Sequence, residues 1–210
     1  MHARVVTVQF KPGTIDEGIK IYRDSIVPEA KKQAGFEGCF LLADHATAKG
    51  ISITMWGMDT QLLDSEKSGY YAAQVAKLTP LLASEVVRDI WEATIHELRA
   101  SMTGTTYARL LATQVVTGKV DEAIRITRDS VLPVARKQKG FEGLLLLTDR
   151  QGSKGLSISC WETLGDLQTT ETSGYLREQL GKITPLLTTA PVKEMFEVVV
   201  QVQSAGTALG

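Results

Sequence analysis

The spacing of apolar and polar residues predicts a strand followed by a long helix at the start of the chain. Residues 4–10 are rich in β-branched side chains and apolar on both alternating faces, which is typical of a strand covered on both sides. From residue 14 to about residue 34 the apolar positions follow helical spacing, and Thr14 with Glu17 has the spacing of a capping box. Pro28 lies inside this helix, so its ring and its missing N–H should kink the helix or split it in two.

Beyond this helix the pattern predicts a hairpin, two further helical stretches and a last strand. Gly35 is expected to end the first helix as a left-handed cap. The later elements are expected to be strands at 39–43 and 51–56, a short helix at 59–67, a longer helix from its N-cap Ser68 through Leu82, and a strand at 86–97. Strand, helix, strand, strand, helix, strand is the order of the ferredoxin-like unit.

The second half of the chain repeats the first half at a constant offset of 105 residues. Arg23-Asp24-Ser25, for example, recurs as Arg128-Asp129-Ser130. When residues 3–97 are aligned with residues 108–202 without a gap, 40 of the 95 pairs are identical. A period of this length is that of a small domain and not of a solenoid unit, so the chain is a tandem duplication.

The duplication predicts the fold class and the domain boundaries. The predicted strands are apolar on both faces, so the sheet face that carries no helices must also be buried, and the other half is the available partner. We therefore expect an α+β fold in which two ferredoxin-like βαββαβ repeats pack their antiparallel sheets into one intramolecular α/β barrel. The expected boundaries are a first repeat at 1–98, a polar linker at 99–106, a second repeat at 107–203 and a C-terminal tail at 204–210.

Composition and charge exclude several classes of partner. The 210 residues are 43% hydrophobic and carry a net charge of -1, which gives no electrostatic case for binding nucleic acid or an anionic membrane. No apolar run approaches the roughly 18 residues of a membrane span, and the N-terminus becomes polar too early for a signal peptide, so we expect a cytoplasmic protein. Cys39 and Cys160 correspond to Leu144 and Met55 in the other copy, so neither cysteine is duplicated. We therefore expect two buried thiols in apolar strands and no disulfide.

Motifs that occur in both copies make the chain resemble the antibiotic biosynthesis monooxygenase (ABM) domains of the dimeric α/β-barrel superfamily. They are the helix pattern Arg-Asp-Ser-x-x-Pro-x-Ala-x-Lys-Gln, the Gly-Phe-Glu-Gly that follows it, the hairpin ending at Trp56 or Trp161, and the Ser-Gly-Tyr before the last helix. The resemblance covers nearly all of the chain. It implies that the fused halves form a pseudo-dimer within one chain, and it leaves open whether that barrel forms a further homodimer. It also implies a monooxygenase-like oxidoreductase.

The residues that haem-degrading members use are absent from the matching positions. Those members need an Asn on the first strand, a Trp in the short helix and a His in the last helix. This chain has Val6 and Leu111, Ser65 and Thr170, and Val75 and Leu180 at these places. We therefore expect no haem and no other cofactor.

Cofactor-free, quinone-forming members place an Asn four residues before the strand Trp, and this position holds Ser52 and Ser157 here. The resemblance makes these two serines candidates for contact with substrate. The Tyr and Arg that such members use further along the chain fall on apolar or small residues such as Leu62 and Ala76. Only the strand Trp is retained from this set.

Aromatic side chains supply the first candidates for chemistry. Trp56 and Trp161 either wall a pocket and donate an indole N–H to a developing anion, or are large core residues at strand ends. Tyr70 and Tyr175 lie close to the start of the last helix, where each phenol either donates to a substrate oxygen or packs with its hydroxyl at the surface.

Polar residues inside the apolar strands are the next candidates. Gln9 and Gln114 either hydrogen-bond a ligand or hold the two sheets together, because a buried amide needs partners. Arg4 and Arg109 either bind an anionic substrate or lie on the surface at a strand edge, and we favour the surface. No Cys or His spacing predicts a metal site.

All three histidines, His2, His45 and His96, lie in the first half, and His96 is a candidate base in that half alone. If the halves differ in role, this distribution indicates that the first half is the active one.

Two functions are therefore considered. The first is a cofactor-independent ABM-like monooxygenase that acts on a small aromatic or polyketide-like substrate. The second is a non-catalytic α/β barrel that binds a small apolar ligand or a partner protein.

Overall fold

The computed structural model describes residues 1–99 and 106–203, and each half has the predicted order of elements. In the first half these are β1 (His2–Gln9), α1 (Ile15–Ile21), a π-helical turn (Tyr22–Ile26), α2 (Val27–Ala30), β2 (Phe36–Asp44), β3 (Lys49–Trp56), α3 (Asp59–Lys67), α4 (Tyr70–Leu78), a 3-10 turn (Thr79–Leu81) and β4 (Val87–Leu98). In the second half they are β5 (Thr106–Gln114), α5 (Val120–Ile126), a π-helical turn (Thr127–Val131), α6 (Leu132–Ala135), β6 (Phe141–Asp149), β7 (Lys154–Trp161), α7 (Leu164–Thr172), α8 (Tyr175–Ile183), a 3-10 turn (Thr184–Leu186) and β8 (Val192–Gln203).

Within the described residues, eight strands are hydrogen-bonded in the order β1-β3-β2-β8-β5-β7-β6-β4, and this order closes into a barrel. The strand pairs β1 with β3, β2 with β3, β4 with β6, β5 with β7 and β6 with β7 are antiparallel. The α+β class and the barrel predicted from the sequence are therefore confirmed.

Contacts between residues divide the chain into two compact units, Met1–Trp91 with Val198–Gly210, and Glu92–Glu197. Each division falls inside the last strand of a repeat, β4 or β8. The second part of β4 therefore belongs to the second unit, where it pairs with β6 from Glu92–Thr148 to Leu98–Gly143. Residues 100–105 of the predicted linker, and the predicted tail at 204–210, lie outside the described residues.

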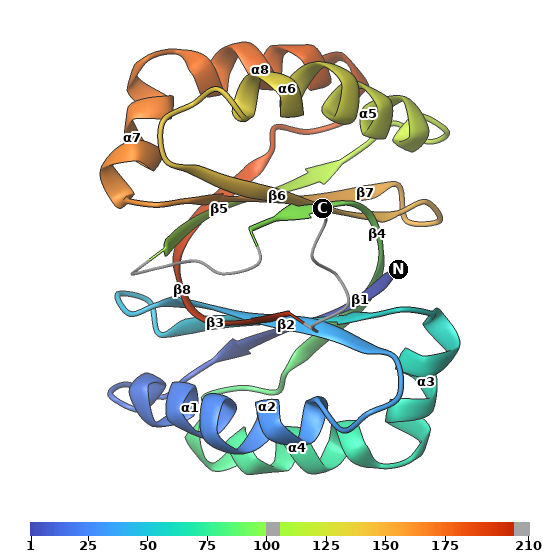
Figure 1. Cartoon of the computed structure of the whole chain (residues 1–210), viewed down its shortest axis with the longest axis vertical. Coiled ribbons are helices and arrows are strands. Elements are labelled where there is room, and N and C mark those ends of the chain that lie inside the picture. The colour runs from blue at the N-terminus through green and yellow to red at the C-terminus, as the bar shows by residue number, and fades with distance from the viewer. Residues whose placement is uncertain (100–105, 204–210) are drawn as a thin grey trace. The chain divides into compact units, whose positions relative to one another are not determined.

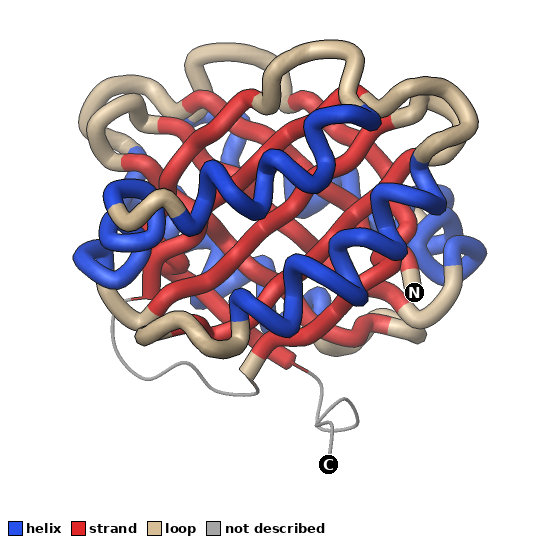
Figure 2. Tube along the Cα trace, turned by 90° about the horizontal axis from the view of Figure 1, so that it is seen from above, coloured by secondary structure: helices blue, strands red, loops and turns tan. Residues whose placement is uncertain are grey.

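In each unit the helices cover one face of the sheet and enclose a hydrophobic core (Figure 1). The tube view shows the helices running obliquely across the strands beneath them (Figure 2). In the first unit Trp56, Leu62 and Tyr22 are buried in this layer. In the second unit Ile124, Leu132 and Leu144 belong to the corresponding core.

The predicted helix around Pro28 is split, as expected, and a π-helical turn precedes the proline in both halves. Proline lacks the N–H that would bond to the carbonyl four residues earlier, and its ring crowds that carbonyl, so a wider turn removes the clash. The helix then ends at Ala30, several residues before the predicted end near residue 34.

Two predicted helix caps are wrong. Thr14 occupies the N-cap position of α1, but its hydroxyl donates to the carbonyls of Lys11 (3.0 Å) and Leu81 (2.9 Å) and so does not cap the helix. The N-cap of α4 is Gly69 with φ +80°, and not Ser68. In both places the chain enters the helix from a tight turn, and the turn determines which groups can reach the free N–H donors.

A glycine lies where the end of β4 pairs with β6, at Leu98 opposite Gly143. Gly143 has φ +144° beside a bulge in β6, and a Cβ at this position would lie 2.2 Å from the carbonyl oxygen of Glu97. Strand backbones can approach this closely only where no side chain intervenes. Gly181 in α8 is the opposite case, because a Cβ there would meet nothing within 4 Å.

We therefore expect Gly143→Ala to lower the free energy of unfolding by about 2–4 kcal/mol, through the clash and the unfavourable φ. Gly181→Ala serves as the matched control and should raise it by about 0.5–1 kcal/mol, since alanine favours the helix and restricts the unfolded chain. Urea unfolding followed by circular dichroism measures both values. Equal effects of the two substitutions would contradict the close approach of β4 to β6.

Candidate active site

Each unit contains a cavity between its sheet and its helices. The cavity of the second unit measures about 100 Å³, and that of the first unit about 60 Å³. In both, the π-helical turn contributes to the wall, through Thr127 and Val131 in one and Tyr22 and Ile26 in the other. Most lining side chains are aliphatic or aromatic. Both cavities are therefore apolar spaces covered by helices, a common setting for small-molecule sites.

A buried arginine from the first strand of each half lines each cavity. Arg4 and Arg109 are both only 3% exposed, so the predicted surface position is wrong for both. An arginine side chain is long enough to cross the layer between sheet and helices, and a short helix supplies its hydrogen-bond acceptors. The guanidinium remains charged at neutral pH, so each cavity has a buried positive charge in a mostly apolar wall.

Arg109 is held by α7 and by an aromatic face. Its Nη1 donates to Thr170 Oγ1 at 2.7 Å, lies 3.9 Å from Glu171 Oε1, and its guanidinium carbon sits 5.5 Å from the ring centre of Trp161. Its Nε is buried and has no hydrogen-bond partner. Burial lowers the pKa of Arg109, while the Glu171 carboxylate acts to raise it.

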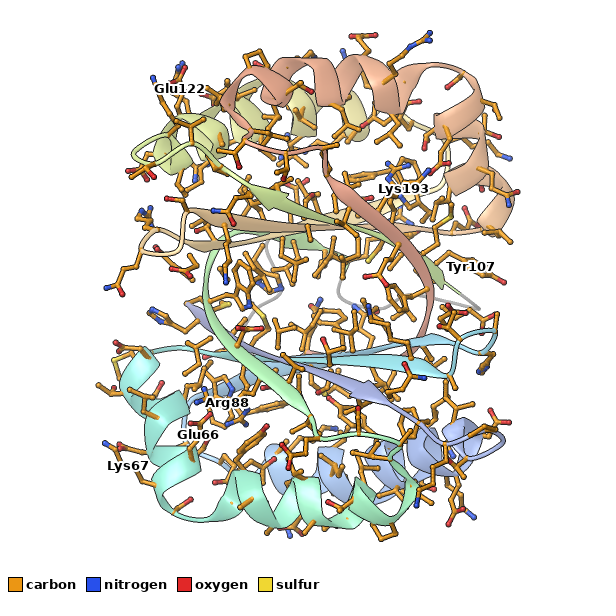
Figure 3. The ribbon with its side chains drawn as sticks, turned by 180° about the vertical axis from the view of Figure 1, so that it is seen from behind. Glu66, Lys67, Arg88, Tyr107, Glu122 and Lys193 are labelled. Carbon is orange, nitrogen blue, oxygen red and sulfur yellow. The ribbon has the colours of Figure 1, made fainter. Side chains whose placement is uncertain are left out.

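Arg4 is bound by more groups. Its Nη1 donates to Ser65 Oγ at 3.1 Å and to Glu66 Oε1 at 3.4 Å. Its guanidinium carbon lies 4.5 Å from the ring centre of Tyr71 and 5.3 Å from that of Trp56. Glu66 also pairs with Arg88 at 3.4 Å, and Figure 3 shows these two side chains close together. Burial lowers the pKa of Arg4, and Glu66 opposes this shift.

The two strand tryptophans are fully buried, and their indole N–H groups are already used. Trp56 Nε1 donates to Thr54 Oγ1, and Trp161 Nε1 donates to Ser159 Oγ, each at 3.1 Å. Trp161 lines its cavity with its ring, whereas Trp56 is not among the lining residues of the first one. Their geometry suits a wall of the site better than a donor to a ligand.

Tyr70 and Tyr175 each line the cavity of their own unit. The ring of Tyr175 meets the edge of Trp161, with centroids 6.5 Å apart. Burial raises the pKa of both phenols to about 12. At neutral pH each hydroxyl therefore keeps its proton and can donate a hydrogen bond, but cannot act as a base.

The remaining sequence candidates are placed differently. Ser52 and Ser157 line the cavities, and Ser52 Oγ lies 2.9 Å from the hydroxyl of Tyr22. Gln9 and Gln114 line neither cavity, because their side-chain amides are bound to the adjacent hairpin turn. Gln9 Nε2 donates to the carbonyls of Thr47 (2.7 Å) and Ala48 (3.2 Å). Gln114 Nε2 donates to the carbonyls of Gly152 (2.9 Å) and Ser153 (3.1 Å).

His96 lies on β4 opposite Leu145 of β6, and it is not among the residues that line the two cavities. The cavity of the second unit, to which His96 belongs, lies on the helix-covered face of the sheet. The buried charged residue that lines this cavity is Arg109.

The described lining residues lack the His with which haem-degrading members hold the iron. None of them is a His, Cys or Met, and the positions that match the family's haem ligands are the apolar Val75 and Leu180. In the part of the chain that the structure describes, no group of His, Cys, Asp and Glu could hold a metal ion, and no helix is long and apolar enough to cross a membrane.

Arg4 and Arg109 were candidates from the sequence, but a surface position was predicted for them, whereas both are buried. A signal was available, because Arg4 and Arg109 are identical at a strand position where the next four residues all differ between the copies. Glu66 and Glu171 are also identical, although the three residues before them differ between the copies. A charged residue that both copies retain within an apolar strand, together with a retained carboxylate, indicates a buried ion pair.

The raised pKa of Tyr175 makes a direct prediction. Ultraviolet titration of the native protein between about pH 9 and pH 11 should be the same for the wild type and Tyr175→Phe, because a phenol with a pKa of about 12 does not ionise in this range. Stability should fall as pH rises above about 10, where the unfolded phenol ionises and the folded one does not. Loss of one titrating phenol in the variant would contradict the buried position of Tyr175.

Comparison with known proteins places the chain within a structural group. No protein-family model matches it. An uncharacterised protein from Mycobacterium tuberculosis is 25% identical over 176 residues, which cover 80% of this chain and 74% of the relative. In structure, a candidate monooxygenase from Fusobacterium nucleatum matches with a TM-score of 0.76 at 12% identity and covers 97% of this chain and 94% of its own.

Two further solved structures are similar. An anthrone oxidase-like protein matches with a TM-score of 0.69 at 14% identity, over 100% of this chain and 95% of its own. A ferredoxin-fold protein related to antibiotic biosynthesis monooxygenases, from Listeria monocytogenes, matches with a TM-score of 0.54 at 9% identity, over 94% and 95%. Together with the internal repeat and the closed barrel, these likenesses show that the chain has the ABM-type dimeric α/β-barrel fold, built here from a tandem duplication.

Proposed function

We propose that the protein is a cofactor-independent, monooxygenase-like oxidoreductase whose substrate is a small aromatic compound that can ionise to a phenolate or enolate. One observation carries the proposal: a buried guanidinium lines an apolar cavity beneath the helices of the second unit, beside a tryptophan ring and a phenol. Such a cavity gives a substrate ring a mostly apolar surrounding and places a positive charge where a substrate anion would form.

The reaction we propose needs no oxidant besides O2. A phenol and O2 give a para-quinone and water, so one oxygen atom enters the ring carbon opposite the phenolic oxygen and the other leaves as water. The substrate supplies all four electrons that reduce O2. The water that forms takes one hydrogen from the ring C–H at the oxidised carbon and one proton from solvent, which balances the phenolic proton that the substrate released when it ionised.

The side chains of the second cavity have distinct roles in this reaction. Arg109 stabilises the substrate anion, which raises its ability to give an electron to O2. Tyr175 donates a hydrogen bond as a neutral phenol, and Trp161 forms an apolar wall against which the ring packs. Ser157 lies on the same wall and can orient a substrate hydroxyl. None of the described lining residues is a carboxylate or a histidine, so the substrate enters as the anion.

The size of the cavity supports a single-ring substrate. Pockets for drug-sized ligands measure about 300–1,000 Å³, and an engineered cavity of about 150 Å³ holds benzene. A volume of about 100 Å³ therefore suits one ring after small side-chain movements. A tricyclic anthrone would require the helices to move away from the sheet.

The lack of a base among the described lining residues favours one alternative, in which the barrel binds a small ligand and does not convert it. This alternative uses the same cavity and the same arginine. It differs from the enzyme in one respect, since no O2 is consumed when the ligand binds.

We also propose that the protein acts in the cytoplasm. Both cysteines are buried and free, which suits a reducing compartment, and the proposed site requires residues of one chain only.

Oxygen uptake tests the proposal. Single-ring phenols, hydroquinones and cyclic 1,3-diketones are supplied in air-saturated buffer, with an anthrone as the large member of the panel, and quinone formation is followed by absorbance. We expect uptake with a single-ring compound, and a loss of about 10²-fold in kcat/KM for Arg109→Met, because the anion loses its charged donor.

Arg136→Met is the matched control, because Arg136 is an exposed arginine of the same unit that pairs with Glu97. It should retain the wild-type kcat/KM. No uptake with any compound would contradict the enzymatic proposal and leave the binding alternative. Uptake that Arg109→Met does not change would contradict the site.

A further inference from the structure

The two cavities differ at three lining positions where the first half has an aromatic side chain and the second half a smaller one. Phe10, Tyr22 and Tyr71 of the first cavity correspond to Val115, Thr127 and Leu176 of the second. The second cavity is the larger, at about 100 Å³ against about 60 Å³. The aromatic residues of the first half therefore fill space that the second half leaves open.

The same replacements decide whether the arginine is accessible from its cavity. In the first unit the ring of Tyr71 stacks on the Arg4 guanidinium at 4.5 Å. In the second unit Leu176 takes the place of this ring, and an aliphatic side chain does not attract a cation through its face. Among the described residues, the guanidinium of Arg109 thus contacts one aromatic ring, that of Trp161, whereas the guanidinium of Arg4 contacts two.

The carboxylate beside each arginine is also placed differently. Glu66 Oε1 lies 3.4 Å from Arg4, whereas Glu171 Oε1 lies 3.9 Å from Arg109, beyond hydrogen-bond distance. Glu171 is drawn to Lys193 instead, at 2.6 Å, and Lys193 replaces the Arg88 that pairs with Glu66 at 3.4 Å. The positive charge of Arg109 is therefore less compensated by protein groups than that of Arg4.

Arg109 retains an unused donor. Its Nε is buried without a hydrogen-bond partner, in a side chain that is only 4% exposed and lines the cavity. A buried charged donor without a partner costs free energy, and an anionic oxygen in the cavity would satisfy it. Most of the remaining lining side chains are apolar and suit a flat ring, and the polar ones include Lys154 and Gln179.

We propose that each chain has one working ligand site, the cavity of the second unit, and that this site binds a small aromatic monoanion whose anionic oxygen contacts Arg109. The first cavity is narrowed by its aromatic side chains, and Arg4 there stabilises the fold. This inference rests on the proposed function for the choice of cavity, but it requires no turnover. It assigns the second half as the ligand-binding half, in contrast to the distribution of histidines.

Calorimetric titration of the full-length protein tests the inference. The probes are benzoate and 4-nitrophenolate, which share a flat ring and an anionic oxygen, and benzamide as the neutral counterpart of benzoate. We expect one site per chain and at least about tenfold tighter binding of benzoate than of benzamide, since a charge-assisted hydrogen bond is about twice as strong as a neutral one. Tighter binding of 4-nitrophenolate than of benzoate would indicate a phenolate substrate, and the reverse order a carboxylate.

The duplicated chain supplies its own matched controls. Arg109→Met should weaken benzoate binding by at least about tenfold, while Arg4→Met should leave it within about twofold, because only one arginine is accessible. Leu176→Tyr copies the aromatic residue of the narrower first cavity into the second unit and should abolish binding with Arg109 still in place. Tyr71→Leu opens the first cavity and should raise the stoichiometry from one ligand per chain to two.

Each outcome is decisive. Equal loss of binding in Arg4→Met and Arg109→Met, or two sites in the wild type, would overturn the assignment of one working half. If Arg109→Met fails to fold, Leu176→Tyr provides the test. Unchanged benzoate binding in Leu176→Tyr would then overturn the assignment. Benzoate binding at one site without any oxygen uptake would refute the proposed enzyme and leave this inference intact. Oxygen uptake without preference for an anionic probe would refute the inference alone.

Discussion

The burial of one guanidinium beneath each helical layer is the constraint on which the rest of the site depends. Removing an arginine from water is costly unless hydrogen bonds and an opposite charge replace the solvent. The first unit meets this cost within the protein, through Ser65, Glu66 and two aromatic faces. The second unit meets it only in part, since Arg109 Nε has no partner and Glu171 is held by Lys193.

This difference arises in a fold that otherwise treats the two halves alike. Both units have the π-helical turn before the proline and the glycine at the strand bulge. Both also have a strand tryptophan whose indole N–H donates to a hydroxyl two residues earlier in the strand. The shared elements set the position of the cavity between sheet and helices. The side chains that differ, and not the backbone, determine whether that cavity is filled or open.

The architecture could be predicted from the sequence because it depends on patterns that repeat. Alternation in the strands, helical spacing and the offset of 105 residues gave the element order and the barrel. The helix caps at Thr14 and Ser68 could not be predicted, because the competing acceptors of Thr14, such as Leu81, come from distant parts of the chain.

The candidate site was predicted less well, for a related reason. Tyr70, Tyr175, Ser52 and Ser157 do line the cavities, since their place in the repeat fixes the face on which they lie. Arg4 and Arg109 were placed on the surface because the rule that charges are exposed holds for isolated residues. This rule fails where a second element supplies hydrogen-bond acceptors for the charged group. Here α3 does so for Arg4 of β1 and α7 for Arg109 of β5, and these are tertiary contacts that the local sequence does not show.

The most direct test of this account is the nuclear magnetic resonance signal of the arginine Nε–H groups in protein labelled with nitrogen-15, recorded while benzoate is added. The account predicts that the Arg109 Nε proton, assigned by its loss in Arg109→Met, moves strongly downfield on binding, while the Arg4 signal stays in place. An Arg109 signal that does not move when benzoate binds, or an Arg4 signal that moves equally, would contradict an anion site formed by the second half alone.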